Sequence, residues 1–199
     1  MRLIGIGRTR PSLQPFHTPR LHAIPPRDVI GYAAAYAGAW DPDALSWLGW
    51  PERPQAELVH WLLDVTDLNR DQRSRELPAS FRTVRQWRRK NSAFFALIDP
   101  ADGRCAGAVS VDTRNGEVGG WLAPGFRGSG LGTELFRAGA RIAHDQLRLP
   151  TARAGTQRTN APCRRALQAA GFTPTDGPAH HTLPDGRTVE ARWYAHQAR

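Results

Sequence analysis

The segment Trp121–Leu135 constrains the fold of this chain more than any other, because it leads from an apolar stretch through closely spaced glycines into a helical pattern. Glycines let the main chain turn so that its amide groups face inward, and the first turn of a helix adds partial positive charge. The Arg127 guanidinium brings a formal charge to the same turn. The pattern predicts that this segment, which includes Arg127, Gly128, Ser129, Gly130, Leu131, Gly132 and Thr133, can cradle a diphosphate.

Strands and helices are both expected around this junction. Before it, extended stretches alternate with glycine-containing turns, which is typical of an antiparallel meander. After it, apolar residues first recur at helical spacing, and the later segments combine helical and extended patterns. The expected order is strands 93–98, 104–112 and 117–122, helix 130–147, strand 152–156, helix 161–170 and a hairpin turning at 184–186. This order predicts a mixed α/β sheet flanked by helices.

The N-terminal part has a different character. Residues 1–20 combine Gly, Pro, Arg and Ser, which predicts a loose leader with room for one short strand. The elements expected next are a strand at 21–24, helices at 29–40 and 44–49, a helix from Pro54, and a basic connection up to residue 92. With 199 residues and 40% apolar content, the chain suits a single core. We therefore expect one domain over 21–199, with a helical arm and basic connection at 21–92 and a core at 93–199.

Charge is unevenly distributed along the chain. The formal net charge of +9 by itself favours a nucleic acid partner. Residues 28–67, however, hold seven acids against the single base Arg53, a local balance of about −6. The bases gather instead at 68–92 and through the C-terminal half. We therefore expect a basic remainder suited to a polyanionic ligand, an acidic arm that favours a positively charged partner, and no binding of nucleic acid.

The composition also bears on the compartment and on metals. The sequence has no run of about 18 uncharged apolar residues, and its start lacks the apolar stretch of a signal peptide, so we expect a cytoplasmic protein with no membrane partner. Cys105 and Cys163 are too few for a disulfide framework and lack the spacing of zinc ligands. Adjacent His180 and His181 would point to opposite faces of a strand, so no metal site is expected.

Two segments together carry a resemblance to a known family. The glycine-rich junction resembles the acetyl-CoA loop of the GNAT acetyltransferases, and Arg127, Gly130 and Gly132 match that family's signature. Residues 160–172 resemble the family's last helix, which starts near an Asn and is followed by a Gly-Phe pair that begins the next strand. The segment Asp41–Gly49 is similar to the first helices of the branch that acetylates the N-termini of ribosomal proteins (RimJ/RimL-like).

The resemblance implies a fold and a cofactor. The implied fold is a mixed, mostly antiparallel twisted sheet of about 6–7 strands flanked by helices, with the fourth and fifth strands splayed apart. Acetyl-CoA would lie in the gap, with its pantetheine facing the amides of Trp121 and Leu122 and its diphosphate held by residues 127–133. Asn160 would also reach the cofactor.

Two residues are candidates for the chemistry that the resemblance implies. An amine that attacks a thioester must lose a proton, and the departing thiolate must gain one. Glu117 stands where this branch often carries a carboxylate and is the candidate general base; a solvated hairpin residue is the alternative. Many family members place a Tyr where this chain has Leu167. Cys163 is therefore the candidate acid, with helix packing as its alternative role.

The acceptor is less constrained than the cofactor. Aromatic and acidic residues in the arm are candidates for binding a cationic acceptor or for packing as a lid, namely Trp40, Asp41, Trp47 and Trp50. We expect transfer to a primary amine of a small molecule, such as an amine-bearing antibiotic or metabolite, with a peptide N-terminus as the alternative. A non-catalytic acyl-CoA sensor and a basic nucleic-acid-binding module are the rivals from other classes, and a homodimer is left open.

Overall fold

The computed structural model describes residues 12–26, 41–49, 92–183 and 185–198. The elements expected at 29–40 and from Pro54, and the basic connection up to residue 91, lie outside these ranges. Trp40 and Trp50 also lie outside them. In the described part of the chain, no helix is long and apolar enough to cross a membrane.

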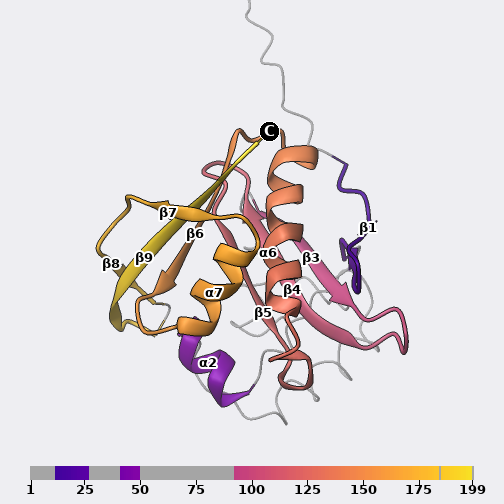
Figure 1. The fold of residues 1–199 in the computed structure, drawn as a ribbon, viewed down its shortest axis with the longest axis horizontal. Helices are drawn as coiled ribbons and strands as arrows, with labels where there is room; N and C mark the ends of the chain where they lie inside the picture. The colour runs from indigo at the N-terminus through magenta and orange to yellow at the C-terminus, as the bar shows by residue number, and fades with distance from the viewer. Residues whose placement is uncertain (1–11, 27–40, 50–91, 184, 199) are drawn as a thin grey trace, which may run out of the picture.

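The first of two sheets contains the predicted meander. Its five strands are antiparallel and follow chain order (Figure 1). They are β1 (Phe16–His17), β2 (His22–Ile24), β3 (Ser92–Ile98), β4 (Cys105–Asp112) and β5 (Val118–Leu122). The bounds of β3, β4 and β5 confirm the expected strands to within a residue or so, because glycine-containing turns fix the ends of such strands.

The second sheet is formed by the C-terminal part of the chain. Its strands are β6 (Thr151–Gln157), β7 (Thr173–Thr175), β8 (His180–Thr182) and β9 (Thr188–Gln197). The long strand β9 pairs antiparallel with the other three. One parallel bridge, Glu117 to Arg153, joins the two sheets among the described residues, and the Arg153 amide donates to the Gly116 carbonyl at 2.9 Å. Beyond this bridge β5 and β6 separate. They correspond to the expected fourth and fifth strands at 117–122 and 152–156, so the predicted splay is confirmed.

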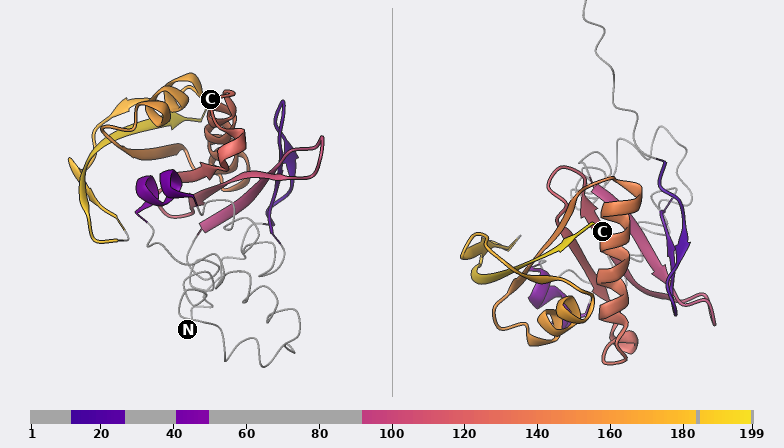
Figure 2. Two further views of the ribbon diagram at one scale, coloured as in Figure 1. Left: turned by 90° about the horizontal axis from the view of Figure 1, so that it is seen from below. Right: turned by 45° about the horizontal axis from the view of Figure 1, so that its top comes forward.

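Helices cover both faces of the sheets. The helices are α2 (Pro42–Leu48), α6 (Leu131–Arg141) and α7 (Ala161–Ala169), with a 3₁₀ turn at Pro124–Phe126 and a π-helical turn at Ile142–Gln146. Figure 2 shows α6 and α7 on one face and α2 on the opposite face. The helix expected at 130–147 is therefore α6 continued by a π-helical turn, because the Leu147 amide bonds to the Ile142 carbonyl five residues back.

Each face of the first sheet has its own apolar cluster. The larger cluster fills the side of α6 and α7 and includes Phe95, Val109, Leu135, Leu167 and Phe172. The smaller one joins α2 to the opposite side through Ala44, Phe94, Ala96, Ala108 and Trp121. Burial on both faces explains why β3 and β4 are nearly continuous apolar runs rather than alternating ones.

Candidate functional site

The glycine-rich junction forms an uncapped start to helix α6. Gly128 and Gly130 have φ values of 78° and 84°, in the left-handed region that favours glycine. Gly130 is the N-cap residue, and no side chain in the described part of the chain caps the first turn of the helix. A Cβ placed on Gly128 would meet no atom of the described residues within 4 Å. The first amides of α6 therefore lie at the positive end of the helix with room for an anion.

Gly132 lets the two C-terminal helices approach closely. A Cβ on Gly132 would lie 3.2 Å from the Cβ of Ala166 on α7. This contact brings the start of α6 beside α7, which begins at the N-cap residue Asn160. The two segments that resemble the family signature are thus neighbours in space.

The register of β5 decides which of its main-chain groups face the gap. Glu117 and Ala123 both bond to β4 through their main chains, because the Asp112 amide donates to the Glu117 carbonyl and the Ala123 amide donates to the Ala106 carbonyl. Antiparallel pairing alternates, so the main chain of Trp121 also faces β4 and that of Gly120 and Leu122 faces the gap. Sequence patterns did not single out Gly120; strand parity alone, given the pairing with β4, would have identified it.

An ion pair with a buried carboxylate lies under the loop. The Glu134 side chain on α6 is only 5% exposed and accepts hydrogen bonds from the Thr18 hydroxyl at 2.7 Å and the Arg20 amide at 3.0 Å. It also forms an ion pair with the Arg20 guanidinium, which donates to the Ser129 carbonyl at 2.8 Å. Burial alone would raise the pKa of Glu134, but the hydrogen bonds from Thr18 and Arg20 outweigh it and lower that pKa. No sequence motif pointed to Arg20 or Glu134.

The Arg127 side chain is directed to neighbouring protein groups. Its Nε donates to the Leu122 carbonyl at 2.9 Å, and its two terminal nitrogens donate to the Asp41 carboxylate at 2.8 and 2.6 Å. Asp41 is the N-cap residue of α2. Two predicted residues with different expected roles, a diphosphate ligand and an acceptor ligand, therefore meet each other in this structure.

Asn160 and Cys163 lie together at the start of α7. The Asn160 side-chain oxygen caps the helix by accepting from the Cys163 amide at 3.0 Å. Burial raises the pKa of the Cys163 thiol, and a hydrogen bond with Thr156 offsets this only in part. Leu167, at the position where many family members have a tyrosine, is fully buried in the core.

Glu117 shares a face of β5 with Trp121 and lies at the closed end of the splay. The Val118 side chain points to α6, since it would contact a Cβ placed on Gly139, and a Cβ placed on Gly120 would contact Leu135. The odd-numbered positions therefore point to the α2 side. The partly buried Glu117 faces that side, two residues before the exposed Gly119.

Helix α2 lies across the gap between the two splayed strands, β5 and β6. Its N-cap residue, Asp41, is tied to the end of β5 through Arg127, and its last turn is tied to the second sheet. There the Gln157 side chain donates to the Trp47 carbonyl at 3.0 Å and Arg187 donates to the Ser46 carbonyl at 2.7 Å. The Trp47 side chain is 40% exposed.

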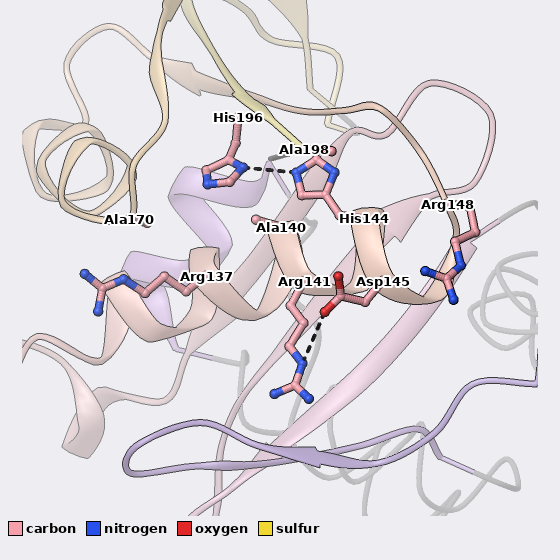
Figure 3. A pocket seen from close by; sticks show the side chains of 9 residues that line it. All are labelled: Arg137, Ala140, Arg141, His144, Asp145, Arg148, Ala170, His196 and Ala198. Atoms are coloured by element: carbon pink, nitrogen blue, oxygen red, sulfur yellow. Dashed lines mark hydrogen bonds and ion pairs between the residues drawn. The ribbon is translucent and has the colours of Figure 1, made fainter.

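A separate hollow of about 540 Å³ lies at the other end of α6 (Figure 3). It is lined by arginines and by His144, which is hydrogen-bonded to His196 at 3.0 Å and to the Leu149 carbonyl at 2.8 Å. Arg137 donates to the Ala169 carbonyl and Arg141 to the His17 carbonyl. Since most of these polar groups already bond to protein atoms, this hollow joins elements together and is not the candidate site.

Comparisons with known proteins agree with this geometry. A family model described as an acetyltransferase (GNAT) domain matches residues 20–173. Similar solved structures include the ribosomal-protein-S5-alanine acetyltransferase from Vibrio fischeri, which is 15% identical with a TM-score of 0.64 and coverage of 92% of this chain and 96% of that one. An acetyltransferase from Agrobacterium tumefaciens is 18% identical with a TM-score of 0.61 and coverage of 98% and 100%.

A third solved structure contains ligands. The microcin C7 self-immunity acetyltransferase, solved in complex with acetyl-CoA and AMP, is 14% identical with a TM-score of 0.62 and coverage of 91% and 94%. No curated protein sequence matches the chain. At these identities the solved structures establish the fold, and the family model, which spans more than half of the chain, establishes the family. The chain therefore belongs to the GNAT family of acetyltransferases, enzymes that take their acetyl group from acetyl-CoA.

Proposed function

We propose that this enzyme transfers the acetyl group of acetyl-CoA to a primary amine of a small molecule. The observation that carries the proposal is the uncapped first turn of α6, with Gly128 and Gly130 in the left-handed region, at the open end of the splayed strands. Such a turn offers several main-chain N–H donors to a diphosphate. Ser129, Leu131, Gly132 and Thr133 belong to the same turn and complete the cradle.

The gap between the strands suits the remaining arm of the cofactor. Bound acetyl-CoA would supply a thioester whose carbonyl carbon accepts the amine. The main-chain groups of Gly120 and Leu122 that face the gap would hold the pantetheine, with Trp121 as the buried side chain that fixes this stretch of β5. Asn160, one residue before α7, would hold the same arm from the other side of the gap.

Glu117 is the proposed general base. Its side chain lies on the α2 face of β5, which is the side from which an acceptor would enter. A carboxylate there can take a proton from the incoming ammonium, directly or through one water, before the nitrogen attacks. Gly119, which lies between Glu117 and Trp121 on this face, is exposed and adds no side chain of its own.

Proton return to the departing thiolate is a smaller part of the proposal. Cys163 lies in the first turn of α7, and a protonated thiol can donate its proton to the departing thiolate. Because burial raises its pKa, the Cys163 thiol is a weaker acid than an ordinary thiol such as that of CoA. Water is thus the better donor, and positioning of the two substrates supplies most of the acceleration.

The acceptor-side wall favours a small amine over a peptide. Helix α2 is tied to both splayed halves, so the acceptor enters beside a fixed helix rather than through an open channel. Asp43 on this helix is 82% exposed and adds negative charge that attracts an ammonium group. Trp47, 40% exposed, offers a ring face to a cationic acceptor.

A paired assay tests the proposal. Free CoA thiol is measured with a panel of small primary amines and, in parallel, with peptides that carry a free N-terminus. Turnover with at least one small amine and none with the peptides supports the proposal. Transfer to peptides alone would establish the ribosomal-protein type of activity instead, and binding of acetyl-CoA without any turnover would favour a sensor.

A further inference from the structure

Arg127 and Asp41 form an ion pair that links the cofactor loop to the acceptor-side helix. The guanidinium meets the carboxylate through two parallel hydrogen bonds of 2.8 and 2.6 Å, the fork geometry that gives arginine–carboxylate pairs their strength and specificity. The third contact, from Nε to the Leu122 carbonyl at 2.9 Å, fixes the guanidinium on the end of β5. The two side chains are 32% and 17% exposed, so the pair is largely shielded from solvent.

Asp41 is held from its own side as well. One carboxylate oxygen accepts from the Ala44 amide at 3.2 Å, and the main-chain carbonyl accepts from the Leu45 amide at 2.9 Å. The hydrogen bond from Arg127 is the largest influence on the pKa of Asp41 and lowers it, against the opposing effect of burial. The residue is therefore a carboxylate that joins the start of α2 to the loop.

The position of α2 gives this contact a wider effect. Its last turn is tied to Gln157 on β6 and to Arg187 in the β8–β9 turn, while its first residue is tied to the end of β5 through Arg127. The strands β5 and β6 are the two that separate beyond the Glu117 bridge. Helix α2 thus connects the two sides of the gap, opposite α6 and α7 (Figures 1 and 2).

We propose that Asp41 and Arg127 are a positioning pair that sets the cofactor loop against the acceptor-side helix, and that Arg127 acts through Asp41 rather than by binding the diphosphate. This inference rests on the proposed function, because it assumes that acetyl-CoA occupies the loop. The diphosphate would then be held by the main-chain amides at the start of α6. Acetyl-CoA binding and the position of α2 are coupled through this ion pair.

Variants of Asp41 and Arg127 can distinguish a positioning role of Arg127 from direct binding of the diphosphate. Asp41→Asn keeps an N-cap residue of equal quality and removes the charge that Arg127 needs. Asp43→Asn is the matched control, since Asp43 lies 3.6 Å from the same guanidinium but is 82% exposed. Arg127→Gln removes the cation, whereas Arg127→Lys keeps a positive charge and loses the two-pronged geometry. Thermal melts of all variants check that each one folds.

Calorimetric titration with acetyl-CoA gives the first readout. A positioning pair predicts that Asp41→Asn, Arg127→Gln and Arg127→Lys each weaken binding by about 5-fold, the low end of coupling between two sites. The Asp41→Asn/Arg127→Gln double variant should be no weaker than either single variant, because both changes break one interaction. In all these variants, the affinity for acetyl-CoA should depend on salt as it does in the unmodified protein. Asp43→Asn should bind acetyl-CoA with unchanged affinity.

Hydrogen exchange gives a second readout that a purely structural role would not move. Acetyl-CoA should slow exchange of the amides in 42–48 in the unmodified protein and in Asp43→Asn, but not in the variants that break the pair. The inference is overturned if Arg127→Gln weakens binding far more than Asp41→Asn and flattens the salt dependence, while Arg127→Lys retains affinity. If the unmodified protein itself does not bind acetyl-CoA, the proposed function fails, and the pair's assigned role fails with it.

Discussion

Replacement of Glu134 by glutamine tests the ion pair between Glu134 and Arg20 beneath the glycine-rich loop that precedes α6. Glutamine keeps the size of the side chain but puts an NH₂ group where donors from Thr18 and Arg20 now converge on the carboxylate. Hydrogen bonds to a charged group contribute about 1.5–3 kcal/mol, and the half-exposed Arg20 side chain places this site toward the lower end. We expect a loss of about 2 kcal/mol in the free energy of unfolding.

This loss converts into a measurable change in melting temperature. For a chain of this size, about 1 kcal/mol shifts Tm by about 2–4 °C, so Glu134→Gln should melt about 4–8 °C lower at pH 7. The matched control is Glu190→Gln, whose partner Arg158 lies in an exposed ion pair with both side chains 58% exposed, and no measurable change is expected there. Circular dichroism melts of the three proteins provide the comparison.

The effect of Glu134 must also depend on pH, with a defined sign. Its pKa is lower in the folded protein than its ordinary value of about 4.3, so the carboxylate contributes its full stabilisation above that value. The contribution disappears as the pH falls through the folded pKa. The Tm gap between the unmodified protein and Glu134→Gln should be largest near neutrality and should shrink below about pH 4. A Tm difference no larger than that of the Glu190→Gln control, or one that does not change in acid, would refute the assigned role.

Four further predictions concern the loop and the chemistry. Gly128→Ala should lose about 1 kcal/mol of stability, because φ is 78° at that position. Gly125→Ala should lose none, since a Cβ there also meets no described atom within 4 Å and φ is not positive. Chemical denaturation of both variants gives the comparison. Glu117→Gln should lower kcat for the best amine by about 100-fold while acetyl-CoA still binds, as expected for loss of a general base; unchanged turnover would remove that assignment. Cys163→Ala should keep kcat within about threefold, since protonation of the leaving thiolate by water replaces it, and a loss nearer 100-fold would make the thiol the acid. In the unmodified protein, Cys163 should react slowly with iodoacetamide at pH 7, because burial raises the pKa of its thiol; mass spectrometry of the labelled peptide measures the rate.

Local sequence patterns determined the elements of the core and the glycine-rich turn that precedes α6. Turn glycines and apolar runs predicted β3, β4 and β5, and the glycines at 128 and 130 predicted a turn with inward amides. Information of this kind is local, since φ preferences and side-chain periods act over a few residues. The helix of 130–147 was right in extent, but its π-helical turn was not predicted.

Only the tertiary structure decided what these residues touch. Strand register assigned Gly120 rather than Trp121 to the gap, and it placed Glu117 on the same face as α2. The partners of Arg127 and Glu134 are 86 and 114 residues away in sequence, at Asp41 and Arg20. Charges in a sequence have no fixed partners until packing brings them together, because pairing energies depend on distance and burial rather than on spacing along the chain. The sequence therefore located the glycine-rich junction before α6, and the fold determined how it is held.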